Sequence, residues 1–135
     1  MTGPAFALPP PPSGWRRGEL VRLVDPTGDA IAWLSPGQGA ACLALHVRDD
    51  NGTWRDVVTD GDDPGITIDG KRTTWELAMR DPTSCELTTP GATLSAWVAD
   101  RALWVEVHVT LDAAVQFGIG VSLDEPDGVA RMHLG

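Results

Sequence analysis

The stretch that decides the fold is ATLSAWVADRALWVEVHVT, residues 92–110, in which two runs of alternating side chains flank the pair Asp100-Arg101. Alternation of apolar with polar residues is typical of a β-strand that buries one of its two faces. A two-residue turn at Asp100-Arg101 pairs residues whose numbers add up to 201, and therefore places Trp97 opposite Trp104. We predict one antiparallel hairpin over this stretch.

The two faces of the predicted hairpin differ in chemistry. One face is apolar throughout and should be the core side, since it carries Leu94, Ala96, Val98, Leu103, Val105, Val107 and Val109. The other face carries Thr93, Ser95, Trp97, Trp104, Glu106 and His108. A slip of one residue would exchange the two faces, so the register decides which of these side chains reach the surface.

The chain from Trp15 onward repeats this pattern of short apolar segments separated by turn signals. No segment keeps a helical period for as long as three turns. The predicted strands cover residues 19–24, 29–35, 40–48, 53–58, 66–68, 73–79, 84–89, 92–99, 102–110, 114–123 and 129–134. Short strands at this spacing predict an all-β fold, an antiparallel two-sheet β-sandwich.

A Pro-rich N-terminal arm precedes the predicted sandwich domain, which spans residues 15–135. The arm, residues 1–14, reads MTGPAFALPPPPSG. Four consecutive prolines lack N–H donors and favour the extended polyproline II conformation, so the arm cannot be a central strand or a helix. The remaining length suits a single domain with its own core.

The composition limits the classes of partner. Ten Lys plus Arg stand against 19 Asp plus Glu, a formal net charge of −9, so we expect neither nucleic acid nor an anionic membrane surface as a partner. The sequence has no apolar segment of the roughly 20 residues that cross a bilayer, and its first residues lack a secretory signal pattern. We therefore expect an acidic, soluble, cytoplasmic protein, with a place in a virion or another assembly left open.

Three segments together resemble aldose 1-epimerases of the galactose mutarotase type. Residues 28–58, GDAIAWLSPGQGAACLALHVRDDNGTWRDVV, resemble the opening of that family. Residues 71–110 resemble its central run of strands, and FGIGVSLDEP, residues 117–126, resembles the segment in which the family places a Gly shortly before a sugar-contacting His. The resemblance covers about two thirds of the chain, mainly in strand order and turn placement, and implies a β-sandwich that handles sugars.

The sequence departs from that family where its sugar is held. Ser122 stands near the expected position of the second His, and Lys71-Arg72 stands where a His-Gly pair would precede a strand. The segment that would bring the late carboxylate has no counterpart, because the chain has about half the length of such an enzyme. The resemblance therefore implies a shortened, non-catalytic relative, and we expect no enzymatic activity.

Direct signs of chemistry are few. Glu106 and His108 lie two residues apart on one predicted strand, share a face, and form the one acid–imidazole pair that the sequence places together. We interpret them as a salt-bridging pair rather than a catalytic dyad. The acidic segment TDGDDPG, residues 59–65, does not have the ligand spacing of a calcium loop, and we find no motif for a metal or a cofactor. We expect Cys42 and Cys85 to be core thiols.

Trp97 and Trp104 are the most unusual feature, because they lie opposite the apolar face of their own hairpin. A second layer of the sandwich, a partner or the Pro-rich arm, or a bound sugar could cover them. Two functions follow: a carbohydrate-binding, mutarotase-like module, or an assembly protein that makes protein–protein interactions and self-associates through its Trp face and arm. The candidate binding residues are Ser95, Trp97, Trp104, Glu106 and His108, with Arg72 marking a second candidate face.

Overall fold

A computed structural model describes residues 20–58, 65–109, 114–118, 121–123 and 129–135 of the chain. The strands are β1 (Val21–Val24), β2 (Ala30–Ser35), β3 (Ala41–Arg48), β4 (Trp54–Asp56), β5 (Ile66–Ile68), β6 (Lys71–Arg72), β7 (Glu76–Arg80), β8 (Ser84–Thr89), β9 (Ala92–Ala99), β10 (Ala102–Val109), β11 (Val115–Phe117), β12 (Val121–Leu123) and β13 (Val129–Leu134). A 3₁₀ turn, η2 (Pro36–Gln38), follows β2. Within the described ranges, no helix has the length and apolar character that crossing a membrane requires.

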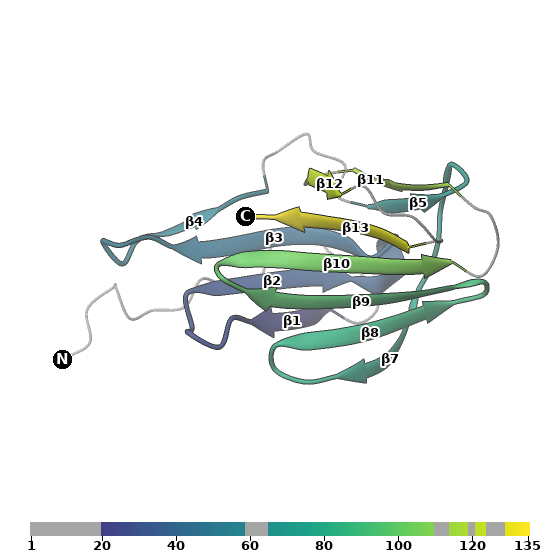
Figure 1. Cartoon of the computed structure of the whole chain (residues 1–135). Helices are drawn as coiled ribbons and strands as arrows, with labels where there is room; N and C mark the ends of the chain where they lie inside the picture. Colours follow the sequence, from purple (N-terminus) through teal and green to yellow (C-terminus); the bar gives the residue numbers. More distant parts are fainter. Residues whose placement is uncertain (1–19, 59–64, 110–113, 119–120, 124–128) are drawn as a thin grey trace.

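The strands form three antiparallel sheets. A six-stranded sheet has the order β12-β13-β10-β9-β8-β7, a four-stranded sheet the order β1-β2-β3-β4, and a small sheet the order β11-β5-β6. Figure 1 shows the strands of the two large sheets running in nearly the same direction, as in an aligned β-sandwich. The predicted all-β sandwich is therefore confirmed, and the small third sheet is an addition that the sequence pattern did not indicate.

The predicted register of the β9–β10 hairpin is confirmed. Its pairs run from Ala102 opposite Ala99 to Val109 opposite Ala92, with Trp97 opposite Trp104. The bounds of β5, β8, β9 and β13 are those predicted. The tight turn at Pro90-Gly91 joins two of these strands, β8 and β9, and leaves little freedom in where each begins and ends.

Two predicted strands differ most from the structure, most of the others differ by one or two residues at an end, and β6 was not predicted. The segment 114–123 is divided between β11, in the small sheet, and β12, at the edge of the six-stranded sheet. A glycine, Gly118, follows β11, and glycine inside a strand pattern commonly marks such a break. The predicted strand 73–79 begins only at Glu76, because the buried Trp75 instead donates its backbone N–H to the carbonyl of Pro36. The predicted arm, residues 1–14, lies outside the described residues.

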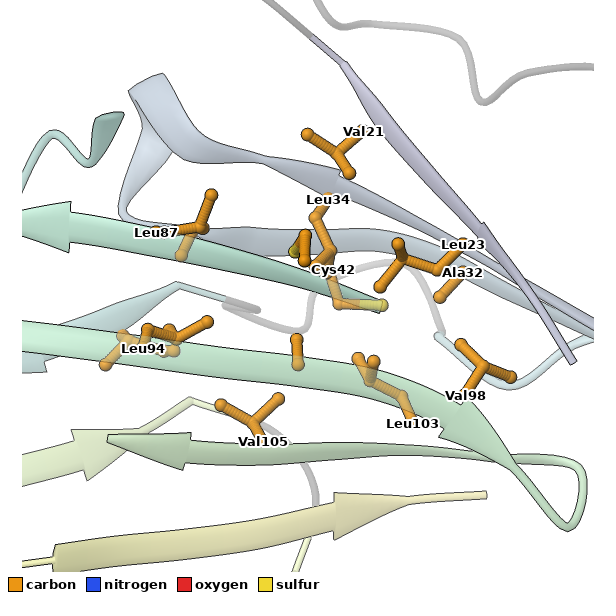
Figure 2. Packing of buried hydrophobic residues seen from close by; sticks show 14 of the residues in the cluster. Val21, Leu23, Ala32, Leu34, Cys42, Leu87, Leu94, Val98, Leu103 and Val105 are labelled. Atoms are coloured by element: carbon orange, nitrogen blue, oxygen red, sulfur yellow. The ribbon is translucent and has the colours of Figure 1, made fainter. Parts of the chain in front are cut away.

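The core fills the space between the two large sheets. Figure 2 shows its side chains entering that space from both sheets, Leu23 and Leu34 from one and Leu94 and Leu103 from the other. Cys42 and Cys85 are buried free thiols, as predicted. Burial raises the pKa of each to about 12, so both remain protonated and serve as core-filling groups.

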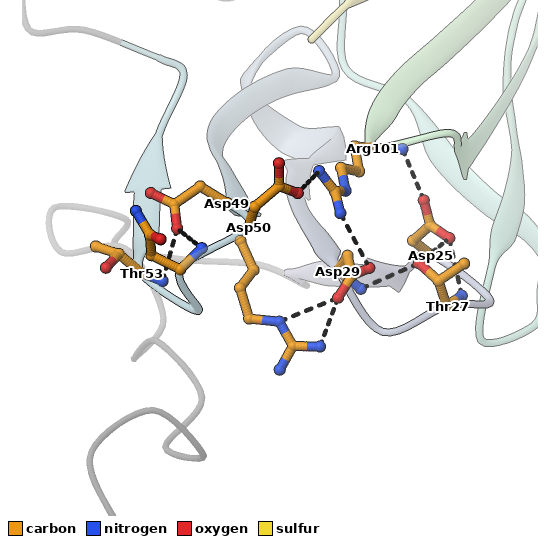
Figure 3. Close-up of polar contacts among 9 residues, drawn as sticks. Asp25, Thr27, Asp29, Asp49, Asp50, Thr53 and Arg101 are labelled. Atoms are coloured by element: carbon orange, nitrogen blue, oxygen red, sulfur yellow. Dashed lines mark hydrogen bonds and ion pairs between the residues drawn. The ribbon is translucent and has the colours of Figure 1, made fainter.

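The turn of the β9–β10 hairpin is fastened to the other sheet by a buried carboxylate. Asp100 and Arg101 adopt φ angles of 54° and 59°, a left-handed conformation that side chains other than glycine rarely take. The backbone N–H of Arg101 donates to the Asp25 carboxylate at 2.8 Å, and the backbone and hydroxyl of Thr27 donate to the same group (Figure 3). Asp25, which follows β1, is only 3% exposed. Its side chain thus joins the two sheets.

The charge state of Asp25 follows from these hydrogen bonds. Burial opposes ionisation of the carboxyl group, but the hydrogen bonds from Thr27 and Arg101 outweigh that effect and hold the pKa of Asp25 below its usual value. The Arg101 guanidinium lies nearby, 3.6 Å from Asp29 and 3.4 Å from the exposed Asp50. Arg101 thus contacts three aspartates, and we expect the hydrogen bond from its backbone N–H to the buried Asp25 to contribute most to stability.

Replacing Asp25 tests this fastening. Asp25→Ala leaves the N–H of Arg101 without its acceptor and should lower the free energy of unfolding by about 2 kcal/mol. Asp50→Ala removes the exposed partner of the same arginine and serves as the matched control, with no change expected. Urea unfolding of both variants measures the effect. Equal stability of the Asp25 variant and the unmodified protein would contradict the role given to this carboxylate.

Candidate functional site

The side chains on the outer face of the six-stranded sheet form rows that cross the strands. Each row joins residues that the register places opposite one another. One row runs through Ser84, Trp97, Trp104 and His133, and its neighbour through Met79, Glu86, Ser95, Glu106 and Arg131. We call the surface formed by these two rows, together with His108, the tryptophan face. It combines an aromatic row with a charged and polar row.

Trp104 is held in place on this face by two contacts. Its ring stacks on that of His133, with ring centroids 5.0 Å apart and ring planes inclined by 20°. Its Nε1–H donates to the carbonyl of Ala99 at 3.1 Å. The indole is only partly exposed, and its one polar atom is already paired. Trp104 can therefore offer a ligand a fixed apolar surface, and no further hydrogen bond.

Trp97 borders a surface hollow of about 300 Å³. Met79, Ser84, Glu86 and Ser95 line the hollow together with Cys85 and Ala96. A bulge between Leu77 and Met79 shifts the register of β7 against β8 and brings Met79 opposite Glu86 on the outer face. As a result Met79 is 61% exposed, an unusual state for so large an apolar side chain.

Glu106 is the charged centre of the tryptophan face. One carboxylate oxygen accepts a hydrogen bond from Nε of Arg131 at 2.6 Å, and the other lies 2.6 Å from Nε2 of His108. The bond from Arg131, and next that with His108, hold the pKa of Glu106 below its usual value. Glu106 is therefore ionised at neutral pH, and both of its oxygens have partners.

This geometry agrees with the salt-bridging interpretation of Glu106 and His108. A general acid would need a raised pKa, whereas that of Glu106 is lowered. The lowered pKa also makes Glu106 a weak general base, and each of its oxygens already has one polar partner. The pair can fix the orientation of His108, whose side chain is 49% exposed and lies where a ligand could reach it.

Arg72 lies apart from the other predicted site residues. It belongs to β6 of the small sheet, whereas Ser95, Trp97, Trp104, Glu106 and His108 all lie on β9 and β10. The Arg72 side chain runs along Gly39 and Gly65, and a Cβ atom added at Gly65 would lie 2.7 Å from its Nε. The structure therefore brings five of the six predicted residues to one face and places Arg72 on another sheet.

Several residues of the tryptophan face were not predicted from the sequence. Glu86, Arg131 and His133 come from β8 and β13, and each lies on the outer face because of simple alternation within its strand. The alternation was readable in the sequence. The order of the strands in the sheet could not be predicted in the same way, and it is this order that places β8 and β13 on either side of the β9–β10 hairpin.

The structure shows no metal centre among the residues it describes, since no three His, Cys, Asp or Glu side chains gather there in a way that could hold an ion. The acidic segment considered above includes Asp60, Asp62 and Asp63, which lie outside the described residues.

Glu106→Gln tests the electrostatic role of this carboxylate. A group with a lowered pKa in the folded state stabilises the fold above its unfolded pKa, and that contribution is lost as the pH falls through the folded pKa. The variant should lose about 1 kcal/mol at pH 7, and the difference should shrink at a pH well below the ordinary Glu value of 4.5. Unfolding free energies measured from pH 7 to pH 3 would show this. A difference that stays constant with pH would contradict it.

Comparison with known proteins identifies no relative: no family model, no curated protein and no solved structure matches the chain. The resemblance to aldose epimerases accordingly stays a prediction from the sequence, and the geometry of the tryptophan face carries the functional argument.

Proposed function

We propose that the protein is a non-catalytic carbohydrate-binding module whose ligand lies on the tryptophan face. The observation that carries the proposal is the adjacency of Trp97 and Trp104 on the outer face of the sheet, beside a row that offers carboxylates and a hydroxyl. The apolar face of a sugar ring packs on an indole, while hydroxyls at the ring edge seek polar partners. Both kinds of partner are present in neighbouring rows.

The hollow beside Trp97 has the polar groups that a sugar would use. Glu86 and Ser95 lie opposite each other on β8 and β9 and line the hollow, where they could accept and donate hydrogen bonds. The carboxylates of this face and the net charge of −9 disfavour acidic sugars. We therefore expect a neutral glycan.

The aromatic row is long enough for a ligand of more than one sugar unit. Trp97, Trp104 and His133 lie on three successive strands, and neighbouring strands are about 4.8 Å apart. A ligand that follows the row would run across the strands, past Trp97 and over the Trp104–His133 stack. The resemblance of the sequence to aldose epimerases points to the same class of ligand.

A second candidate function is assembly through protein–protein contacts on the same face. Met79 favours it, because an apolar side chain that is 61% exposed beside a tryptophan is typical of a surface that a partner covers. β7 is also an edge strand of its sheet, to which another strand could add. Self-association would appear as a mass above that of the single chain in analytical ultracentrifugation.

Titration of tryptophan fluorescence with neutral oligosaccharides selected on a glycan array tests the carbohydrate proposal. Trp97→Ala should weaken binding about fivefold to tenfold, since it removes a stacking surface worth about 1 kcal/mol or more. Trp54→Phe, on the four-stranded sheet, is the matched control and should bind like the unmodified protein. The proposal fails if sugars at millimolar concentration leave the fluorescence unchanged, or if the control loses as much affinity as the Trp97 variant.

A further inference from the structure

The outer face of the four-stranded sheet carries a second apolar cluster, separate from the core. Along β2, Ala30, Ala32 and Leu34 enter the core between the sheets, so the alternate residues Ile31 and Trp33 point to the opposite side. They form a cluster with Ala44 of β3, and three partly buried side chains pack against it: Leu20, Val24 and Trp54. We call this surface the Trp33 face.

The Trp33 face is buried although it is not the face that packs on the six-stranded sheet. Ile31 is 1% exposed and Trp33 is 8% exposed. The two large sheets face each other through β1, β2 and β3 on one side and β8, β9 and β10 on the other, and β2 enters this interface with its opposite face. Arg22 lies over the Trp33 ring, with its guanidinium carbon 5.9 Å from the ring centroid, at the border of the cluster.

Two buried nitrogen atoms on or beside this face have no partner among the described residues. They are Nε1 of Trp33 and Nδ1 of His46, which lies opposite Ile31. Burial lowers the pKa of His46, which favours its neutral form. An indole N–H can only donate, and leaving such a donor buried without an acceptor costs free energy. The Trp33 face therefore calls for an apolar cover that supplies hydrogen-bond acceptors.

We propose that the Pro-rich segment Leu8–Pro12 of the same chain packs on the Trp33 face and accepts a hydrogen bond from the Trp33 indole. A polyproline II segment makes no internal hydrogen bonds, so its carbonyl groups are free acceptors, and its prolines bring no N–H of their own. Aromatic grooves bind such segments by packing proline rings on a tryptophan, whose indole N–H donates to a carbonyl of the segment. The donor of the face and the acceptors of the segment are complementary.

The position of the arm in the chain supports the same occupant. Five residues, 15–19, join the arm to Leu20, which precedes β1 at the edge of this sheet and already packs against the Trp33 cluster. Four strands are about 15 Å across, and the four prolines lie eight to eleven positions before Leu20, a length of chain that spans at most about 25–34 Å at the rise of polyproline II. This length of chain is therefore enough for the four prolines to reach the Trp33 cluster.

The charge pattern favours the arm over the other segments outside the described ranges. Residues 1–14 contain no charged side chain, so their burial costs no desolvation of an ion. Residues 15–19 carry two arginines and a glutamate, residues 59–64 carry three aspartates and residues 124–128 carry three acidic side chains, and all of these would be costly to bury on an apolar face. Residues 110–113 and 119–120 connect strands of the other two sheets. The proposal leaves the tryptophan face open to a ligand.

The indole N–H resonances of the full-length ¹⁵N-labelled protein test this proposal. The Trp33 resonance is assigned by its loss in Trp33→Phe. Replacing the four prolines by serine (P9S/P10S/P11S/P12S) should shift the Trp33 resonance and speed its hydrogen exchange by roughly tenfold. The resonances of Trp97 and Trp104 should not move, and that of the core residue Trp75 reports that the fold is intact.

A matched control is deletion of residues 2–5, which shortens the arm but keeps the four prolines and should leave the Trp33 resonance unchanged. The unmodified protein should also show cross-relaxation between proline Hδ atoms and the Trp33 ring, a measurement that needs no variant. The proposal is overturned if the serine variant leaves Trp33 unchanged, or if Trp97 and Trp104 respond instead. It is overturned as well if sedimentation shows a dimer that the serine substitutions dissociate, because the segment would then lie on a second copy.

Discussion

The register of the β9–β10 hairpin is the constraint on which the rest of the structure depends. Its two strands are the centre of the six-stranded sheet, and β8 and β13 pair with their outer edges. Side chains alternate between two faces, so a shift of β10 by one residue against β9 would bury Trp104 and bring Leu103 and Val105 to the surface. The core and the candidate site are thus determined by the same pairing.

Two features hold this register. The continuous apolar face of the hairpin packs against the residues of β1, β2 and β3 that enter the core, and that burial is lost if the strands slip. The turn itself is unfavourable, because Asp100 and Arg101 both take left-handed backbone conformations without being glycine. The buried Asp25 carboxylate compensates by accepting the N–H of Arg101, so a residue far away in the sequence stabilises the turn.

Much of the fold could be predicted from the sequence because alternation and turn residues are local signals. The register of the hairpin, its two faces and the buried state of Cys42 and Cys85 all follow from them. Other features depend on contacts between distant residues. The small sheet that pairs β11 with β5, and the bond from Arg101 to Asp25, have no local signature.

The candidate site was predictable to a similar degree. Five of its residues lie on one hairpin, so alternation alone placed them together, including Glu106 beside His108. Arg131 and His133 could be added only once β13 was known to pair with β10. The position of Met79 depends on a bulge in β7, which the alternation in that segment did not reveal. Arg72 was placed by the resemblance of its segment to a known family and lies on a different sheet.

The most direct test of the central claim is a measurement of the hairpin register in solution. In a two-residue hairpin, alternate opposite pairs bring their Hα atoms close together, and these include Ala96 with Val105 and Leu94 with Val107. Strong Hα–Hα nuclear Overhauser effects within these two pairs are the expected result. Effects that instead join Ala96 to Trp104 or Glu106 would mean that β10 turns its opposite face to the core, and would contradict both the core and the tryptophan face described above.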